Sequence, residues 1–189
     1  MSDDELEWRL GIRLPGHDYK VFTTAFVDGE HPRAGKKRFS LIEAVDWVNV
    51  IALTRDEQVV LIRQYRVGVG RVCLEIPGGM VDPGEDAQTA AARELVEETG
   101  YTAQRWEHLG SVAPNPALQN NTLHSYLAFD AELTHGQKLE GSEVVTVETV
   151  PLRDVTELLK RGAIEHALVV AAFGHLAFRL GELRRPESA

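Results

Sequence analysis

The sequence has little sulfur chemistry and no long apolar run. Cys73 is the one cysteine, so no disulfide can form within the chain, which fits a reducing compartment. We expect Cys73 to be a small buried hydrophobe rather than a nucleophile. The longest apolar stretch, residues 167–178, is interrupted by Gly174 and His175 and is too short to cross a bilayer. The acidic N-terminal residues lack a secretory signal pattern, so we expect a cytoplasmic protein with no membrane partner.

Basic residues are also few. Lys and Arg number 20 against 29 Asp and Glu, giving a net charge of −9. Nucleic-acid-binding proteins usually carry a basic patch, and none is visible in the sequence, so we expect no nucleic-acid partner. An acidic protein that acts on an anionic substrate needs local positive charge, which a metal ion and a few arginines can supply.

Residues 78–101 combine a glycine-containing loop with a helical pattern. The loop over residues 78–84 carries two turn signals, Gly-Gly and Pro-Gly. Strong helix formers fill residues 90–95, and Gly100 is suited to end the helix. Residues three and four positions apart are neighbours on a helix, so one stripe carries three carboxylates: Glu94, Glu97 and Glu98.

Three like charges on one stripe repel each other, and a divalent cation would remove that repulsion. Carboxylate oxygens suit Mg²⁺ or Mn²⁺, and Mg²⁺ commonly takes substrate phosphates among its remaining ligands. The ordinary alternative is a solvated acidic helix face. Glu85 and Arg93 in the same segment, together with the glycine loop, favour the metal site.

The spacing of this segment resembles the Nudix box of the Nudix hydrolases. Tyr101 stands where that box usually has an aliphatic residue, and the other fixed positions match. In order they are Gly79, five residues, Glu85, seven residues, Arg93-Glu94-Leu95, one residue, Glu97-Glu98, one residue and Gly100. The resemblance implies that Glu94, Glu97 and Glu98 hold the metal, with the Gly78 carbonyl as a further ligand. It also implies that Glu98 is essential to catalysis and that Glu85 and Arg93 form a supporting salt bridge.

The order of strands, helix, strands and helices predicts an α/β/α sandwich with a mixed sheet, which is also the fold that the resemblance implies. We expect a hydrolase domain over residues 46–189 and an N-terminal β segment over residues 1–45. Within that segment residues 1–19 look loosely structured. In related enzymes the equivalent strands pair with a second subunit, so the resemblance implies a homodimer. Two further helices are expected, one opened by a capping-box pattern at residues 154–157 and one over residues 164–183.

Three arginines around the strand before the box are candidates for substrate binding. Arg63, Arg66 and Arg71, followed by the run at residues 74–79, resemble the pattern of ADP-ribose pyrophosphatases and their nucleotide-sugar relatives. Arginine can contact a diphosphate through paired hydrogen bonds. The alternative is that these side chains only face solvent.

The remaining substrate contacts rest on weaker signals. Pro116 lies about fifteen residues beyond the box, where a proline is typical of the ADP-ribose branch, and Asn120 nearby could bind sugar hydroxyls; a plain turn is the alternative. Trp47 could stack on a nucleobase, although core packing is equally compatible with its place in a β pattern. The resemblance further implies a general base on a polar loop after the box, for which Glu140 is the first choice and Glu143 the second. Both could instead be exposed loop charges.

The sequence therefore predicts metal-dependent hydrolysis of the diphosphate bond of ADP-ribose or a nucleoside diphosphate sugar, with a nucleoside monophosphate and a sugar phosphate as products. Two alternatives stay open: a Nudix hydrolase of dinucleotides or nucleoside triphosphates, and a ligand-sensing Nudix module.

Overall fold

The computed structural model describes residues 3–139, 141 and 143–181. The chain forms two compact units, Met1–Val45 with Ala113–Thr122 and Asp46–Val112 with Leu123–Ala189. The first unit includes the segment 113–122, which the sequence did not predict.

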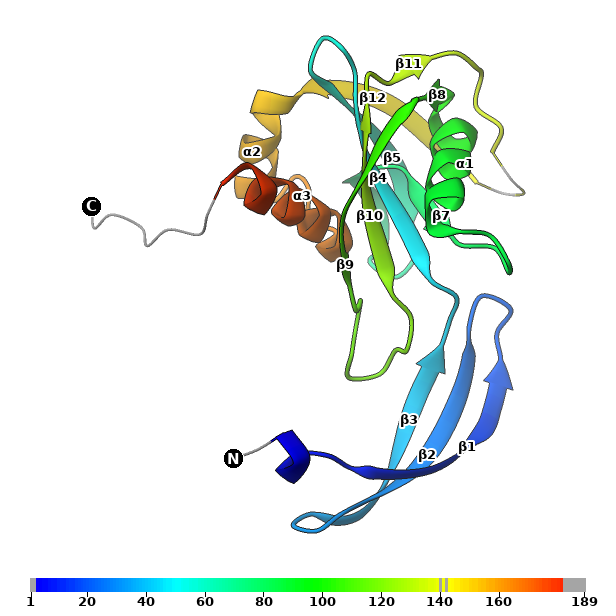
Figure 1. Ribbon diagram of the computed structural model, residues 1–189. Coiled ribbons are helices and arrows are strands. Elements are labelled where there is room, and N and C mark those ends of the chain that lie inside the picture. Colours follow the sequence, from blue (N-terminus) through cyan, green and yellow to red (C-terminus); the bar gives the residue numbers. More distant parts are fainter. Residues whose placement is uncertain (1–2, 140, 142, 182–189) are drawn as a thin grey trace. The chain divides into compact units, whose positions relative to one another are not determined.

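The first unit is an antiparallel three-stranded sheet with β2 in the middle (Figure 1). Its elements are a 3-10 turn η1 (Asp3–Glu5) and the strands β1 (Arg9–Asp18), β2 (Thr23–His31) and β3 (Gly35–Glu43). On one face Ala25 and Val27 are buried, and Trp8 packs edge-to-face on Phe39 with ring centroids 4.9 Å apart. The segment 113–122 is joined to the end of β3, because the Ile42 amide donates to the Leu118 carbonyl at 2.8 Å.

The prediction that residues 1–19 are loosely structured is wrong, because β1 occupies Arg9–Asp18. The sequence of this strand contains Gly11, Pro15 and Gly16, and glycine and proline disfavour the prediction of a strand. Proline cannot donate to a sheet and is confined to edge strands and bulges, and β1 is an edge strand with two register shifts. Leu10, Ile12 and Leu14 do alternate along this strand, and that alternation is the signal that could have identified it.

The second unit is built on a seven-stranded mixed sheet in the order β12-β5-β4-β10-β9, with β6 pairing β5 and β7 pairing β4. Strands β4 and β10 are parallel and the other pairs are antiparallel. A separate small pair joins β8 (Tyr101–Thr102) to β11 (Glu132–Leu133). The strands of the large sheet are β4 (Trp47–Leu53), β5 (Gln58–Arg66), β6 (Arg71–Glu75), β7 (Gly78–Met80), β9 (Arg105–Val112), β10 (Leu123–Phe129) and β12 (Val145–Pro151).

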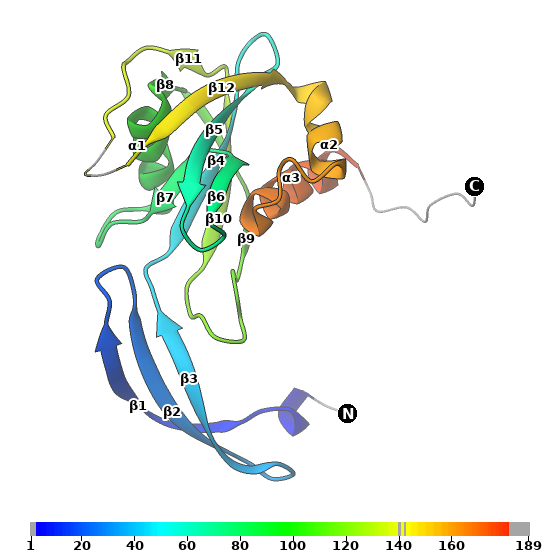
Figure 2. The same cartoon turned by 180° about the vertical axis from the view of Figure 1, so that it is seen from behind.

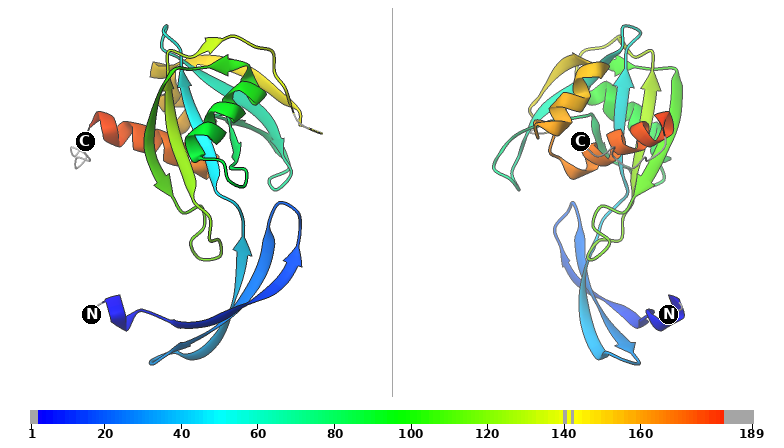
Figure 3. Two further views of the ribbon diagram at one scale, coloured as in Figure 1. Left: turned by 45° about the vertical axis from the view of Figure 1, so that its right-hand side comes forward. Right: turned by 90° about the vertical axis from the view of Figure 1, so that its left-hand side faces the viewer.

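Helices cover both faces of this sheet (Figures 2 and 3). Helix α1 (Ala87–Thr99) packs on one face, where Val48, Val50 and Leu95 belong to one apolar cluster. Helices α2 (Leu152–Lys160) and α3 (Ala167–Leu180) lie on the other face, over a second cluster that includes Ile51 and Phe173. The predicted α/β/α sandwich with a mixed sheet is confirmed. No helix within the described residues has the length and apolar character of a membrane span.

Both predicted helices after the box begin at other residues than expected. Helix α2 starts at Leu152, ahead of the predicted capping box, and its first amide is satisfied by the Glu57 carbonyl at 2.9 Å. Helix α3 starts at Ala167 instead of residue 164, because the Ile164 amide still bonds back to Leu158. The start of α2 is therefore set by a tertiary contact, and the start of α3 by the turn before it, rather than by the local sequence signals used for the prediction.

Helix α1 ends at Gly100, as its sequence predicts, and begins at a cap that the sequence analysis did not identify. The Asp86 side chain caps the amides of Gln88 and Thr89, as expected for an N-cap aspartate. Gly100 ends the helix in the left-handed conformation, with φ 77°. A β-carbon at Gly100 would lie 2.1 Å from the His135 carbonyl oxygen, so this position requires glycine for two independent reasons.

A pair of glycine substitutions separates these two reasons. Gly84 also has a positive φ, of 86°, but no atom lies within 4 Å of its β-carbon position. We expect Gly84→Ala to lose only the conformational term of roughly 1–2 kcal/mol. Gly100→Ala should lose several kcal/mol, because the clash with His135 adds to that term. Urea unfolding of the two variants measures the difference, and equal losses would contradict the packing described at the end of α1.

Candidate active site

Two glycines let the sheet approach the carboxylates of α1. A β-carbon on Gly78 would lie 2.2 Å from the Val48 carbonyl oxygen, and one on Gly79 would lie 2.3 Å from a Glu94 carboxylate oxygen. Strand β7 therefore accepts no side chain at either position without displacing β4 or Glu94. The glycine pair, which reads as a turn signal in the sequence, is a short strand whose backbone faces the carboxylates of the helix.

Glu98 is the most enclosed of the three helix carboxylates. The residue is 4% exposed, and its Oε2 accepts a hydrogen bond from the Gly78 amide at 2.8 Å. Burial raises the pKa of Glu98 to about 8, and the charges of Glu94 and Glu143 act in the same direction. Burial likewise raises the pKa of Glu94. The site therefore concentrates carboxylates that are hard to ionise without an added positive charge.

Arg93 connects the loop before α1 to the helix itself. Its guanidinium donates to Glu85 at 3.0 and 3.2 Å and to the Met80 carbonyl at 2.9 Å. The same guanidinium also donates to Glu94 at 2.9 Å and to Glu97 at 3.1 Å. Hydrogen bonds to Arg93 lower the pKa of Glu85. The ion pair expected between Glu85 and Arg93 is present, whereas the contacts of Arg93 with Glu94 and Glu97 were not foreseen.

The donor set suits a hard divalent cation. Glu94, Glu97 and Glu98 supply carboxylate oxygens, which Mg²⁺ and Mn²⁺ prefer. No side-chain hydrogen bond from lysine or arginine to the buried Glu98 carboxylate is seen within the described residues. In that part of the chain no three acidic, histidine or cysteine side chains already surround one point. Arg93 holds two of the carboxylates, so a cation would compete with Arg93 for Glu94 and Glu97.

A loop after β11 is fastened to the C-terminal end of α1. The Gln137 amide group donates to the Glu98 carbonyl at 2.6 Å and to the Val145 carbonyl at 3.2 Å. The Lys138 amide donates to the Glu97 carbonyl at 2.8 Å. The backbone that carries two of the carboxylates is therefore bonded directly to this loop. Sequence reasoning missed Gln137, because its role depends on contacts 39 and 8 residues away.

One of the two base candidates, Glu143, is among the described residues. Glu143 is close enough for its charge to raise the pKa of both Glu94 and Glu98. Glu140, the first choice from the sequence, lies outside the described residues.

The three candidate arginines each form a two-point ion pair with a carboxylate. Arg63 pairs with Glu148 at 2.8 and 3.0 Å, and Arg71 pairs with Glu165. Both pairs are solvent-exposed, so they are expected to contribute little to stability. Each of the three arginines therefore has a carboxylate partner, and the side chains of Arg63 and Arg71 also face solvent.

Arg66 differs from the other two because its partner is buried. Glu75 is 2% exposed and accepts two hydrogen bonds from Arg66, each of 2.8 Å. His166, at the start of α3, places its Nε2 4.0 Å from the same carboxylate. The charge of Arg66 lowers the pKa of Glu98 against the effect of burial. Arg66 is therefore held beside the carboxylates of α1, and sequence reasoning missed Glu75, the residue that holds it.

The remaining predicted contacts are distributed over both units. Trp47 is half-buried at the start of β4, between the backbones of Met80 and Leu123, and belongs to neither apolar cluster of the described residues. Pro116 and Asn120 belong to the first unit, where both are exposed. The Asn120 side-chain oxygen accepts from the Ala44 amide at 3.1 Å, so this oxygen is used to fasten the segment 113–122.

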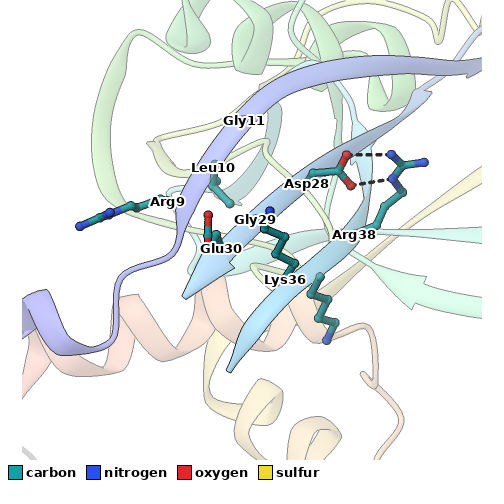
Figure 4. Close-up of a pocket in the computed structure, with 9 residues that line it drawn as sticks. Arg9, Leu10, Gly11, Asp28, Gly29, Glu30, Lys36 and Arg38 are labelled. Carbon is teal, nitrogen blue, oxygen red and sulfur yellow. Dashed lines mark hydrogen bonds and ion pairs between the residues drawn. The ribbon is translucent and has the colours of Figure 1, made fainter. Parts of the chain in front are cut away.

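The first unit carries a groove of its own, of about 580 Å³ (Figure 4). Arg38 and Asp28 form a two-point ion pair at 2.7 Å along one side. Four basic side chains against two acidic ones make the groove locally positive in an acidic protein. It is lined by Arg9, Leu10, Gly11, Asp28, Gly29, Glu30, Lys36, Lys37 and Arg38.

The raised pKa of Glu98 predicts how the stability of the metal-free protein depends on pH. Because the folded protein favours the neutral carboxyl, it binds the proton more tightly than the unfolded chain between about pH 4.5 and 8. The free energy of unfolding should therefore fall as pH rises through this range. Each pKa unit corresponds to about 1.4 kcal/mol, so the contribution of Glu98 is several kcal/mol. Urea unfolding with a chelator present should show a smaller fall in Glu98→Gln, and parallel curves would contradict the buried, cation-free environment of this carboxyl.

Comparisons with known proteins agree with this geometry. The NUDIX domain family matches residues 45–173. The chain is 28% identical over 161 residues to an ADP-ribose pyrophosphatase of Bacillus subtilis (strain 168), which covers 85% of this chain and 87% of that one. It is 35% identical over 136 residues to an ADP-sugar pyrophosphatase of Mus musculus, covering 68% of this chain and 62% of that one.

Two further likenesses extend this result. A methanol dehydrogenase activator of Bacillus methanolicus is 30% identical over 150 residues, which is 79% of this chain and 81% of that one. A solved structure described as the crystal structure of ADP compounds hydrolase has the same fold, with a TM-score of 0.80 at 23% identity over 92% of this chain and 94% of that one. Because the family match spans residues 45–173, most of the chain, this protein belongs to the Nudix family.

Proposed function

We propose that this protein is a divalent-cation-dependent pyrophosphohydrolase that cleaves the diphosphate bond of ADP-ribose or a nucleoside diphosphate sugar. The products are a nucleoside monophosphate and a sugar phosphate. The observation that carries the proposal is the buried Glu98 carboxylate on the Gly78 amide, where the charges of Glu94 and Glu143 add to the effect of burial and raise its pKa. Relatives named ADP-ribose pyrophosphatase and ADP-sugar pyrophosphatase support the substrate class.

We propose Mg²⁺ as the cation, with Mn²⁺ as the substitute of similar ligand preference. Glu94, Glu97 and Glu98 are its ligands in this proposal, with the carbonyl of Gly78 in addition. When bound, such an ion neutralises phosphate charge and makes its bound water more acidic. The raised pKa values of Glu94 and Glu98 support this assignment, because each carboxylate is more easily ionised next to a cation.

Proton transfer and substrate orientation fall to residues around the helix. Glu140 is the first candidate, and Glu143 in the loop after β11 the second, for the base that accepts the proton of the attacking water. Gln137 and Lys138 hold that loop to the backbone of Glu97 and Glu98. The loop that would carry the base is therefore hydrogen-bonded to α1, the helix that carries the carboxylates.

Arg66 is the arginine best placed to contact the diphosphate. Glu75 fixes its guanidinium through two hydrogen bonds, so the donors that remain have a set direction before substrate arrives. Arg63 and Arg71 would have to share or leave their pairs with Glu148 and Glu165 to bind substrate. Roles for Trp47 in base stacking and for Pro116 and Asn120 in sugar binding remain part of this proposal.

We further propose a cytoplasmic homodimer that uses the N-terminal strands. Leu10 and Ile12 on the edge strand β1 are 61% and 81% exposed, and unpaired edges with apolar side chains favour association. Ile12→Asp should lower the mass measured by sedimentation from that of a dimer to that of a monomer. A wild-type chain that sediments as a monomer at micromolar concentration would contradict the dimer.

A substrate panel tests the proposed reaction. We expect purified protein with Mg²⁺ to release a sugar phosphate from at least one of ADP-ribose, ADP-glucose, GDP-mannose and UDP-glucose. Glu98→Gln should reduce the rate on the order of 10²-fold or more, because the proposed cation loses a charged ligand. Folding should be retained, since glutamine resembles the neutral carboxyl that burial favours.

Glu157→Gln, on an exposed turn of α2, is the matched control and should leave the rate unchanged. If no member of the panel is hydrolysed, but dinucleotides or nucleoside triphosphates are, the substrate class is wrong and the catalytic site stands. If Glu98→Gln turns over as fast as the wild type, the assignment of the site itself is wrong.

A further inference from the structure

A row of polar positions crosses the large sheet on the side away from α1. Asn49 of β4 is the register partner of Ser125 of β10, and Ser125 is the partner of Gly110 of β9. Side chains at directly opposed positions share one face of a sheet. The apolar neighbours Ile51 and Leu127 belong to the cluster beneath α2 and α3, so the row faces these helices.

Helix α3 covers the row at both ends. The Asn49 side-chain amide donates to the Leu168 carbonyl at 3.0 Å. At the other end the His175 ring lies against Gly110, where a β-carbon would come within 2.6 Å of two ring atoms. The absent side chain of Gly110 therefore makes room for an imidazole next to Ser125.

Three polar atoms in this row have no hydrogen-bond partner among the described residues. They are the side-chain oxygens of Asn49 and Ser125 and the Nε2 of His175, all shielded from solvent. Asn49 is 6% exposed and Ser125 is 1% exposed. Buried polar groups are almost always hydrogen-bonded in native proteins, to protein or to ordered water. The three residues lie on adjacent register positions and on the helix that covers them, so ordered water is the partner that this part of the sheet can share.

We propose that this row is an internal water site. The amide oxygen of Asn49 can only accept, the Ser125 hydroxyl donates and accepts, and His175 Nε2 does one or the other according to its tautomer. Water has two donors and two acceptors, and internal waters usually make about three hydrogen bonds. One water, or a connected pair, satisfies all three atoms and joins β4, β10 and α3.

The site lies directly behind the glycine that contacts Glu98. Asn49 is the register partner of Gly78, and a β-carbon on Gly78 would lie 2.8 Å from the Asn49 Cα. The position of Asn49 therefore limits the position of Gly78, whose amide binds Glu98. The bound water supports the backbone of the candidate active site from the opposite face of the sheet.

The change in melting temperature caused by Ser125→Ala differs in sign between the two possible states of the Ser125 hydroxyl. If Ser125 is truly unpartnered, Ser125→Ala removes a buried polar atom at no loss, so the melting temperature stays the same or rises. If Ser125 binds the proposed water, a hydrogen bond is lost and the melting temperature should fall by about 2–4 °C, the shift expected for a chain of this size. Ser40→Ala, which removes an exposed hydroxyl from β3, is the control and should shift it less.

Two further measurements are independent of that sign. The double variant Ser125→Ala/His175→Phe should lose less free energy of unfolding than the two single variants lose in sum, because both substitutions remove partners of the same water. A high-resolution crystal structure should show ordered water within hydrogen-bonding distance of at least two of the three atoms. Strict additivity, an unchanged or higher melting temperature in Ser125→Ala, or side chains bonded directly to one another without water would overturn the proposal.

Discussion

The contact between the Glu98 carboxylate and the Gly78 amide is the interaction on which the rest of the site depends. It requires a glycine with no room for a side chain and a carboxylate taken out of water. Burial alone disfavours the ionised form, and neighbouring carboxylates disfavour it further. Such an arrangement lowers the free energy of unfolding, and a cation that binds at the site would offset that loss.

The scaffold around this contact is fixed from several directions. Asp86 and Gly100 determine where α1 begins and ends, and Arg93 holds the preceding loop against it. Gln137 ties the following loop to the carbonyls of the same helix. Behind β7, Asn49 and the start of α3 support the glycine strand. The carboxylates therefore lie on a helix that is fixed at both ends, and the loop that begins at Gln137 and Lys138 is anchored to the same helix.

The sequence was most informative where the determining contacts are local. The end of α1 at Gly100, the shared stripe of Glu94, Glu97 and Glu98, and the α/β/α layering follow from turn chemistry and periodicity. The partners of Arg66 and Gln137 could not be predicted, because Glu75 and the α1 carbonyls meet them only through the sheet pairing and the loop path. Strand β1 was missed because Gly11, Pro15 and Gly16 interrupt the alternating Leu10, Ile12 and Leu14. The start of α2 was misplaced because the Glu57 carbonyl supplies what a local cap would have given.

The central claim is that the glutamates of α1 bind a divalent cation, and isothermal titration calorimetry with Mg²⁺ and Mn²⁺ tests it most directly. The titration is done with and without a nonhydrolysable ADP-ribose analogue, on the wild type and on Glu98→Gln. The account predicts cation uptake by the wild type, stronger with the analogue present, and markedly weaker uptake by the variant. Absence of uptake under both conditions, or equal affinity in the two proteins, would contradict it.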